Sequence, residues 1–165
     1  MCAALVACSS SHGVTTGHAL TAVGPQGNGT LGFSSGVVGQ TYRWAFPQLK
    51  NTGKTPVTVT SFAMDKVPAI FQIVGYPVYS QSDVGSYIVD FADSDHRGLP
   101  DLVHKPNHAG KPITIAAGQQ SPRYAMVAAK LLKNATDPLT GCVVYYQVGE
   151  AKYRQRFDCQ FQIGG

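Results

Sequence analysis

The end of the chain, from Gly141 to Gly165, alternates apolar and polar residues on either side of a short turn. Two runs rich in Val, Tyr and Phe flank the turn at residues 149–152, and this pattern predicts a β-hairpin. In the register that places Cys142 opposite Cys159, one face of the hairpin is mostly apolar and the other mostly polar. The same register pairs Val144 with Phe157, Tyr146 with Gln155 and Val148 with Tyr153. A shift by one residue would turn arginines toward the core, so we expect this register and a Cys142–Cys159 disulfide.

Further alternating runs predict strands along the middle of the chain. Two of them, residues 41–50 and 56–64, flank the polar turn Asn51-Thr52-Gly53-Lys54 and predict a second hairpin. The other predicted strands cover residues 70–79, 86–91, 112–116 and 124–133. The last is ambiguous, because its Ala and Leu content favours a helix while its position between turns favours a strand; we predict a strand. About seven strands with turns at short intervals are typical of an all-β sandwich.

The residues around the second hairpin resemble a known fold pattern. The run Leu49–Val59 is similar to the N-x-G-x-x-P-V-x-V strand pair of immunoglobulin-like domains in bacterial exported proteins. Together with the terminal hairpin, the resemblance covers residues 41–165 and implies an immunoglobulin-like antiparallel β-sandwich. The Cys-Trp-Cys order of antibody domains is absent, because Trp44 precedes both late cysteines. The resemblance therefore concerns the fold and is nearly silent on function.

The N-terminal part differs in composition from the rest. Residues 9–40 are rich in Gly, Ser and Thr, and no Asp, Glu, Lys or Arg occurs before Arg43. This composition predicts a flexible tether, although residues 31–38 could add an edge strand. Before it, Leu5-Val6-Ala7-Cys8 resembles the lipobox of bacterial lipoproteins. The resemblance implies that residues 1–8 are the remnant of a lipoprotein signal peptide and lipobox, and that a lipid on Cys8 anchors the protein to a membrane.

The expected compartment follows from the cysteines. A disulfide persists only in an oxidising environment, so the Cys142–Cys159 pair indicates the cell envelope or secretion, outside the cytoplasm. The formal net charge of +4 comes from scattered Lys and Arg and argues only weakly for anionic partners.

Residues of the kind that ligate metals gather between Asp90 and Lys111. The candidate ligands are Asp93, Asp95, His96, His104 and His108. Imidazoles on one long loop could hold a Zn or Cu ion, with an aspartate completing the shell. The alternative is a solvated loop with ordinary polar residues. Loops of this length are usually functional or disordered, so we also expect this one to face a partner.

The sequence contains no context typical of a catalytic nucleophile, so we expect neither enzymatic activity nor a cofactor. The polar face of the terminal hairpin presents Tyr145, Arg154 and Arg156, which are candidate binding residues. An exported location argues against nucleic acid as their partner and favours a protein or a cell-surface glycan. The leading hypothesis is a non-catalytic envelope lipoprotein that presents a β-sandwich to such a partner. The alternative is an exported metal-binding protein that uses residues 90–111.

Overall fold

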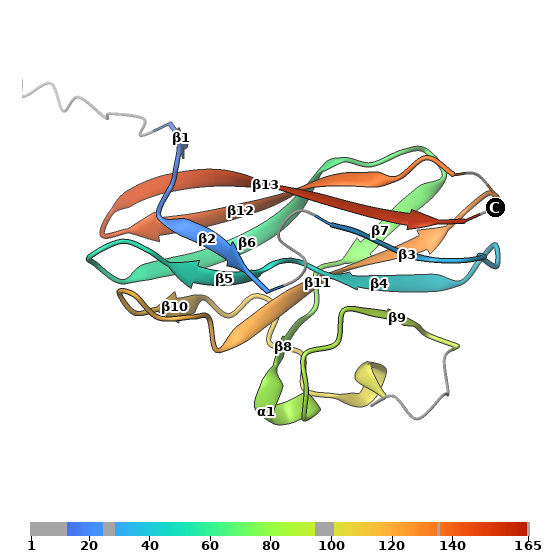
Figure 1. The fold of residues 1–165 in the computed structure, drawn as a ribbon, viewed down its shortest axis with the longest axis horizontal. Coiled ribbons are helices and arrows are strands. Elements are labelled where there is room, and N and C mark those ends of the chain that lie inside the picture. Colours follow the sequence, from blue (N-terminus) through green and yellow to red (C-terminus); the bar gives the residue numbers. More distant parts are fainter. Residues whose placement is uncertain (1–12, 25–28, 95–100, 135, 165) are drawn as a thin grey trace, which may run out of the picture.

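The computed structural model describes residues 13–24, 29–94, 101–134 and 136–164. It is almost entirely β, with 54% of residues in strands and 5% in helices. Two sheets pack face to face, and a smaller layer of loops and short helical turns lies beyond the second sheet (Figure 1). None of the helices in the described ranges is long and apolar enough to cross a membrane.

The first sheet is built on the terminal hairpin. Its antiparallel strands, in spatial order, are β13 (Ala151–Ile163), β12 (Leu139–Val148), β6 (Val57–Lys66) and β10 (Ile113–Ile115). Two short strands run parallel to β13, namely β1 (Thr15–Thr16) and β3 (Thr30–Phe33).

The second sheet has β11 near its centre. Its antiparallel strands, in spatial order, are β7 (Phe71–Gly75), β11 (Arg123–Leu131), β4 (Thr41–Ala45) and β9 (Asp90–Ala92), and β8 (Val78–Ser80) also pairs with β11. A separate ladder joins β2 (Leu20–Val23) to β5 (Gln48–Asn51). The short helical elements are α1 (Gln81–Val84) and the 3-10 turn η1 (Leu102–His104).

The order of the long strands identifies the topology. In chain order, β4, β6, β7, β11, β12 and β13 correspond to strands B to G of an immunoglobulin domain. Strands β7, β11 and β4 then form the D-E-B sheet, and β13, β12 and β6 form the G-F-C sheet, as in that fold. The predicted immunoglobulin-like sandwich is confirmed.

The main core lies between the two sheets and is centred on Trp44. This side chain is fully buried, stacks on Phe161 with ring centroids 5.8 Å apart and meets Phe71 edge-on. Alternate residues of β11 and β12, including Val127 and Tyr146, complete the layer. Burial of large aromatic surface between twisted sheets is the main stabilising term of such a sandwich.

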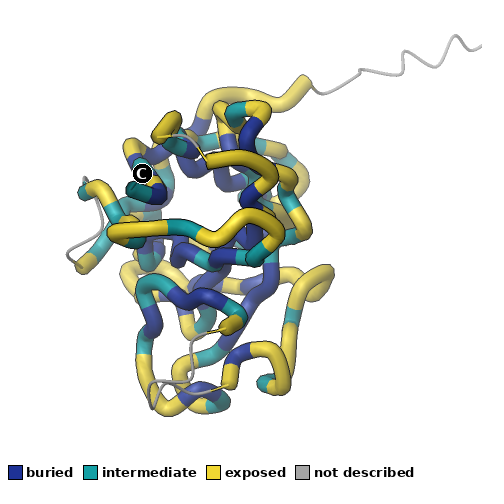
Figure 2. Tube along the Cα trace, turned by 90° about the vertical axis from the view of Figure 1, so that its right-hand side faces the viewer, coloured by how far each residue is buried: buried dark blue, intermediate teal, exposed yellow. Residues whose placement is uncertain are grey.

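A second apolar cluster covers the outer face of the second sheet. It contains Ala45, Tyr79, Val84, Ile88, Phe91, Leu102, Tyr124 and Met126. Residues 81–89 and 101–111 supply Val84, Ile88 and Leu102 to this cluster, and we call these two segments the cap. Figure 2 shows buried residues continuing from the sandwich into this lower layer.

The cap explains why the sequence of β11 was ambiguous. One face of β11 packs into the main core through Val127 and Leu131, and the other packs under the cap through Tyr124 and Met126. A strand that is buried on both faces is apolar at successive positions and loses the alternation that distinguishes a strand from a helix. The predicted strand at 124–133 is confirmed as β11.

The disulfide between Cys142 and Cys159 is confirmed, with sulfur atoms 1.98 Å apart and Cα atoms 5.7 Å apart. The predicted register is wrong by two residues, because Cys142 pairs with Phe157 and Val148 pairs with Ala151. The turn has two central residues, of which Gly149 has φ 58°, rather than the four that were expected. A bulge opposite Gly141 then brings Cys159 back within reach of Cys142. Because the shift is two residues, every side chain keeps its predicted face.

Three stretches of the glycine-rich N-terminal segment, β1, β2 and β3, pair with strands of the rest of the domain. Strand β2 pairs with β5, and the side chain of Leu20 is buried in the main core. A Cβ atom at Gly17 would lie 2.0 Å from the hydroxyl of Tyr146, and one at Gly32 would lie 2.5 Å from the carbonyl oxygen of Gln162. Glycine at these two positions permits close packing, whereas the composition predicted a tether over residues 9–40. Residues 9–12 and 25–28 of that prediction lie outside the described ranges.

Candidate functional site

A polar hollow opens where the cap meets β10 and the start of β11. Its volume is about 520 Å³, and its lining consists of Ser80, Ser82, Asp83, His108, Pro112, Ile113, Thr114, Pro122 and Arg123. Pockets of roughly 300–1,000 Å³ with a few convergent polar groups are the usual form of a small-ligand site. The hollow therefore has the volume of a small-ligand site, with a lining that is mostly polar.

Local helix chemistry positions Ser80 and Asp83. Ser80 is the N-cap of α1, and its hydroxyl oxygen accepts a hydrogen bond of 3.1 Å from the backbone N–H of Asp83. The same hydroxyl donates to Asp83 Oδ2 at 2.6 Å. This reciprocal arrangement resembles a capping box with an aspartate at the third helical position. Gly85, with φ 85°, ends the helix after one turn.

The loop after η1 brings His108 to the same carboxylate. His108 Nε2 lies 2.8 Å from Asp83 Oδ2, and its side chain is mostly buried. The backbone N–H of His108 donates to the carbonyl oxygen of Val78 at 2.8 Å. The side-chain oxygen of Asn107 accepts from the backbone N–H of Val78 at 2.9 Å. These bonds fasten the cap to β8 and hold the imidazole at the edge of the hollow.

The charge of Asp83 is stabilised by its neighbours. Hydrogen bonds from Ser80 and then from His108 hold the pKa of the Asp83 carboxyl below its usual value, and the nearby Arg123 acts in the same direction. Asp83 is therefore ionised at neutral pH, and its oxygen atom Oδ2 already has two partners.

Ser80, Asp83 and His108 have the residue types of a catalytic triad but not its order. In a triad, the histidine lies between the serine and the aspartate so that it can take the hydroxyl proton. Here Asp83 lies in the middle, and both the hydroxyl of Ser80 and the imidazole of His108 contact it. The arrangement aligns hydrogen-bonding groups around a hollow, and it gives Ser80 no imidazole base.

The structure separates the described members of the predicted metal set. Asp93 forms an ion pair with Arg43, His104 Nδ1 lies 2.5 Å from Asp101 Oδ2, and His108 contacts Asp83. Asp95 and His96 lie outside the described residues. Within the described ranges, no group of three or more His, Cys, Asp or Glu residues is placed to hold a metal ion. The described part of the loop instead packs as the cap, with the side chain of Leu102 fully buried.

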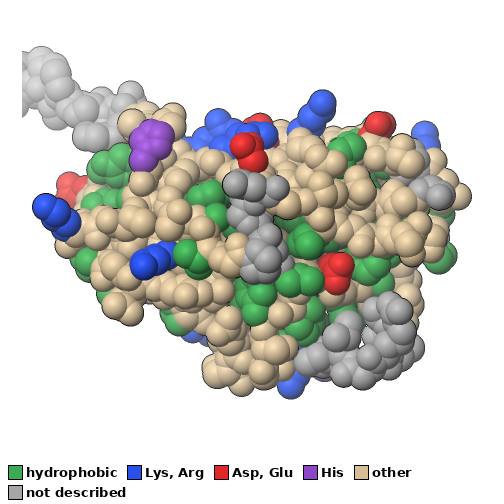
Figure 3. Space-filling view, viewed as in Figure 1, with side chains coloured by type: hydrophobic (Ala, Val, Ile, Leu, Met, Phe, Trp, Pro, Cys, Tyr) green, Lys and Arg blue, Asp and Glu red, His purple; other side chains and the backbone are tan. Residues whose placement is uncertain are grey.

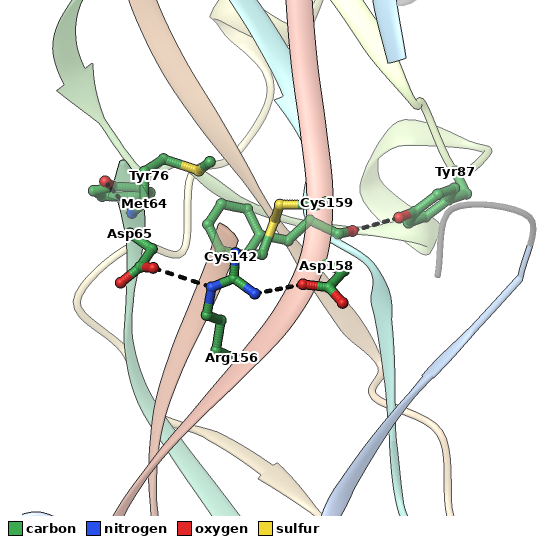
Figure 4. Close-up of a disulfide and its surroundings, with 9 residues drawn as sticks. Met64, Asp65, Tyr76, Tyr87, Cys142, Arg156, Asp158 and Cys159 are labelled. Carbon is green, nitrogen blue, oxygen red and sulfur yellow. Dashed lines mark hydrogen bonds and ion pairs between the residues drawn. A yellow bond between two sulfur atoms is a disulfide. The ribbon is translucent and has the colours of Figure 1, made fainter. Parts of the chain in front are cut away.

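The predicted hairpin residues do lie together on the outer face of the first sheet. Tyr145 is opposite Arg154 in the β12–β13 ladder. Both arginines bind Asp65 of β6, with Arg154 Nη2 2.8 Å from Oδ1 and Arg156 Nε 3.0 Å from Oδ2. Figure 4 shows Arg156 between Asp65 and Asp158, which is its second carboxylate partner.

These carboxylates change the chemistry of that face. Hydrogen bonds to Asp158 and Asp65 raise the pKa of Arg156 and neutralise its charge locally. Figure 3 shows Lys and Arg side chains beside acidic ones along the upper edge of the molecule. Arg154 and Arg156 are therefore paired with carboxylates and do not form a free cationic patch.

Sequence reasoning missed most of the hollow. Its polar lining comes from β8, the two segments of the cap, β10 and β11, several of which are far apart in the chain. The one local signal was the Ser80-x-x-Asp83 spacing, which predicts a helix N-terminus. His108 was noted only as a metal ligand, and Cys8, the predicted lipidation site, lies outside the described residues.

Comparison with known proteins adds little to this geometry. No family model matches the chain, and no curated protein matches it. A solved structure titled "Structure of Vibrio cholerae VesB protease" is similar, with a TM-score of 0.42 and 12% sequence identity. The match covers 84% of this chain and 31% of that one, so this chain spans about a third of the protease chain's length. A likeness at this level carries no argument about activity.

Proposed function

We propose that this chain is a non-catalytic binding module of an oxidising, extracytoplasmic compartment, anchored to a membrane through a lipid on Cys8. The observation that supports an oxidising compartment is the Cys142–Cys159 disulfide, which is buried and joins β12 to β13. Structural disulfides of this kind persist in secreted and envelope proteins and are rare in the cytosol.

Two features support binding over catalysis. The polar hollow orders its groups around a carboxylate, and within the described part of the chain the imidazole of His108 contacts Asp83 rather than Ser80. The outer face of the first sheet balances its arginines with Asp65 and Asp158. Both surfaces suit contact with a protein or a glycan better than they suit bond cleavage.

A capture experiment tests the binding function. The full oxidised chain, immobilised and exposed to fragments of the producing cell's envelope, should retain a specific protein or glycan. The matched control is the same chain after reduction, alkylation and unfolding, which should retain nothing above background. Equal retention by the folded and unfolded chains, or none by either, would contradict the proposal.

The lipid anchor has its own test. Replacing Cys8 by Ala should move the protein from the membrane fraction to the soluble fraction, because the acyl chains attached there supply the membrane affinity. Cys2→Ala is the matched control and should stay in the membrane fraction, since Cys2 precedes the proposed attachment site. A Cys8→Ala protein that remains with the membrane would refute lipid attachment at this residue.

A further inference from the structure

We propose that the polar hollow between the cap, β10 and β11 binds the carboxylate of an acidic sugar, and that it prefers this monoanion to a sugar phosphate. The inference rests on the proposed binding function and names the class of ligand. Its main element is Arg123, supported by Asp83 and by the hydroxyl groups of the lining.

Arg123 differs from the other arginines that the structure describes. Arg43, Arg154 and Arg156 all form ion pairs with aspartates. Among the described residues, the guanidinium of Arg123 has neither an ion pair nor a hydrogen bond, although it lines the hollow and is only partly exposed. A guanidinium binds a carboxylate through two parallel hydrogen bonds, so Arg123 gives the hollow a fork of donors without a partner among the described residues.

The backbone at Arg123 is fixed by its neighbours. Arg123 pairs with Ser80 in the β11–β8 ladder. The hydroxyl of the buried Ser121 accepts from the backbone N–H of Arg123 at 3.3 Å and donates to its carbonyl oxygen at 2.5 Å. The start of β11 is thus fixed on the same side as α1, and little ordering of the backbone is needed on binding.

The negative charge of Asp83 influences which anion the hollow binds. It is ionised and close enough to Arg123 for the two charges to interact. The hollow is therefore close to neutral, and an incoming anion feels the repulsion of Asp83 as well as the attraction of Arg123. The attraction and the repulsion both double for a dianionic phosphate, so in a nearly neutral hollow the second charge gains little net attraction, whereas the cost of removing the anion from water rises more steeply with its charge. A single carboxylate is the anion that this arrangement favours.

The rest of the lining indicates a sugar as the carrier of that carboxylate. The exposed hydroxyl of Thr114 can both donate to and accept from the hydroxyls of a sugar ring, and that of Ser82, which lies 2.8 Å from the hydroxyl of Ser80, can accept from them. Pro112, Pro122 and Ile113 supply apolar wall between them. A sugar ring presents several hydroxyl groups close to its carboxylate, which matches this lining more closely than the side chain of an acidic peptide does.

Three monosaccharides that differ only at carbon 6 test the inference. The full chain is titrated by NMR with galacturonic acid, galactose and galactose 6-phosphate. Galacturonic acid should bind about tenfold more tightly than galactose, as expected for one charge-assisted fork. Galactose 6-phosphate should bind more weakly than galacturonic acid. Equal affinities for the acid and the neutral sugar would overturn the proposal, as would tighter binding of the phosphate.

Single substitutions test which residues produce these differences in affinity. Arg123→Gln should reduce the affinity for galacturonic acid to that for galactose, whereas Lys130→Gln, which removes one positive charge at the exposed far end of β11, should leave it unchanged. Asp83→Asn should lower the ratio of the affinity for galacturonic acid to the affinity for galactose 6-phosphate, because it removes the negative charge beside Arg123. Thermal unfolding of each variant confirms that it is folded. Full galacturonic acid binding by a folded Arg123→Gln protein contradicts the assignment, and so does an unchanged preference in Asp83→Asn.

A fourth probe distinguishes a sugar from a peptide. The blocked tripeptide acetyl-Gly-Glu-Gly-amide carries one carboxylate and should bind more weakly than galacturonic acid, so tighter binding of the peptide would reject the sugar.

The capture experiment distinguishes a failure of this inference from a failure of the proposed binding function. Capture of an envelope partner that survives Arg123→Gln would refute the inference alone.

Discussion

Replacing Cys142 and Cys159 together by Ala should lower the free energy of unfolding by about 3 kcal/mol and the melting temperature by roughly 6–12 °C. The two residues are 17 apart in sequence, so the bond closes a short loop and removes a limited amount of entropy from the unfolded chain. Both side chains are buried, and the alanines also leave space in the main core. The measurement is urea unfolding of the oxidised protein and of the double variant.

The reduced wild-type protein is the control for this prediction. In the presence of a thiol reductant it should unfold close to the double variant, because both lack the cross-link. Identical stability of the oxidised protein and the double variant would contradict the stabilising role. Peptide mapping that finds both cysteines as free thiols in protein from its native source would remove the argument for an oxidising compartment.

Replacing Leu102 by Ala should destabilise the protein by about 2–5 kcal/mol, the usual range for a buried leucine. The Leu102 side chain is fully buried in the second cluster, and the hydroxyl of Tyr79 donates to its carbonyl oxygen at 3.2 Å. A cavity there should loosen the cap before it affects the sandwich, because the cap contributes few of the cluster's apolar residues. His108 lies in the cap, so its contact with Asp83 should also weaken.

Hydrogen exchange distinguishes loosening of the cap from loosening of the sandwich. In Leu102→Ala, the backbone amides of the cap, including that of His108, should exchange faster, whereas those in the centre of β12 should change less. Val103→Ala is the matched control, since the neighbouring Val103 side chain is 51% exposed and its loss should change stability by less than about 0.5 kcal/mol. Equal behaviour of the two variants would show that the cap is not held by Leu102.

The turn at Asn51 is held by both local and long-range hydrogen bonds, and only the local ones can be expected from the sequence. The residue types predicted a polar turn that joins two paired strands, and the structure has β5 and β6 on either side of it. The predicted second hairpin is wrong, because β5 pairs with β2, β6 pairs with β10 and β12, and β4 lies in the other sheet. Asn51 itself is fully buried: its side-chain oxygen accepts from the backbone N–H of Gly53, and its amide group donates to the carbonyl oxygens of Thr55 and Ile115. The bonds to Gly53 and Thr55 are local. The bond to Ile115, 64 residues away, depends on how the strands pack.

The sequence by itself determined the all-β class, the position of most strands, the faces of the terminal hairpin and the disulfide. These features follow from alternation, turn residues and cysteine placement, which act over a few neighbouring residues. Only the tertiary structure decided the hairpin register, because a two-residue shift leaves every side chain on the same face and so leaves no trace in the pattern. Only packing could show that Gly17 and Gly32 lie against other chain segments, since a glycine-rich segment reads the same whether it is loose or closely packed. The hollow with Asp83, His108 and Arg123 likewise exists only because the cap folds over β11 and brings together residues that no local spacing connects.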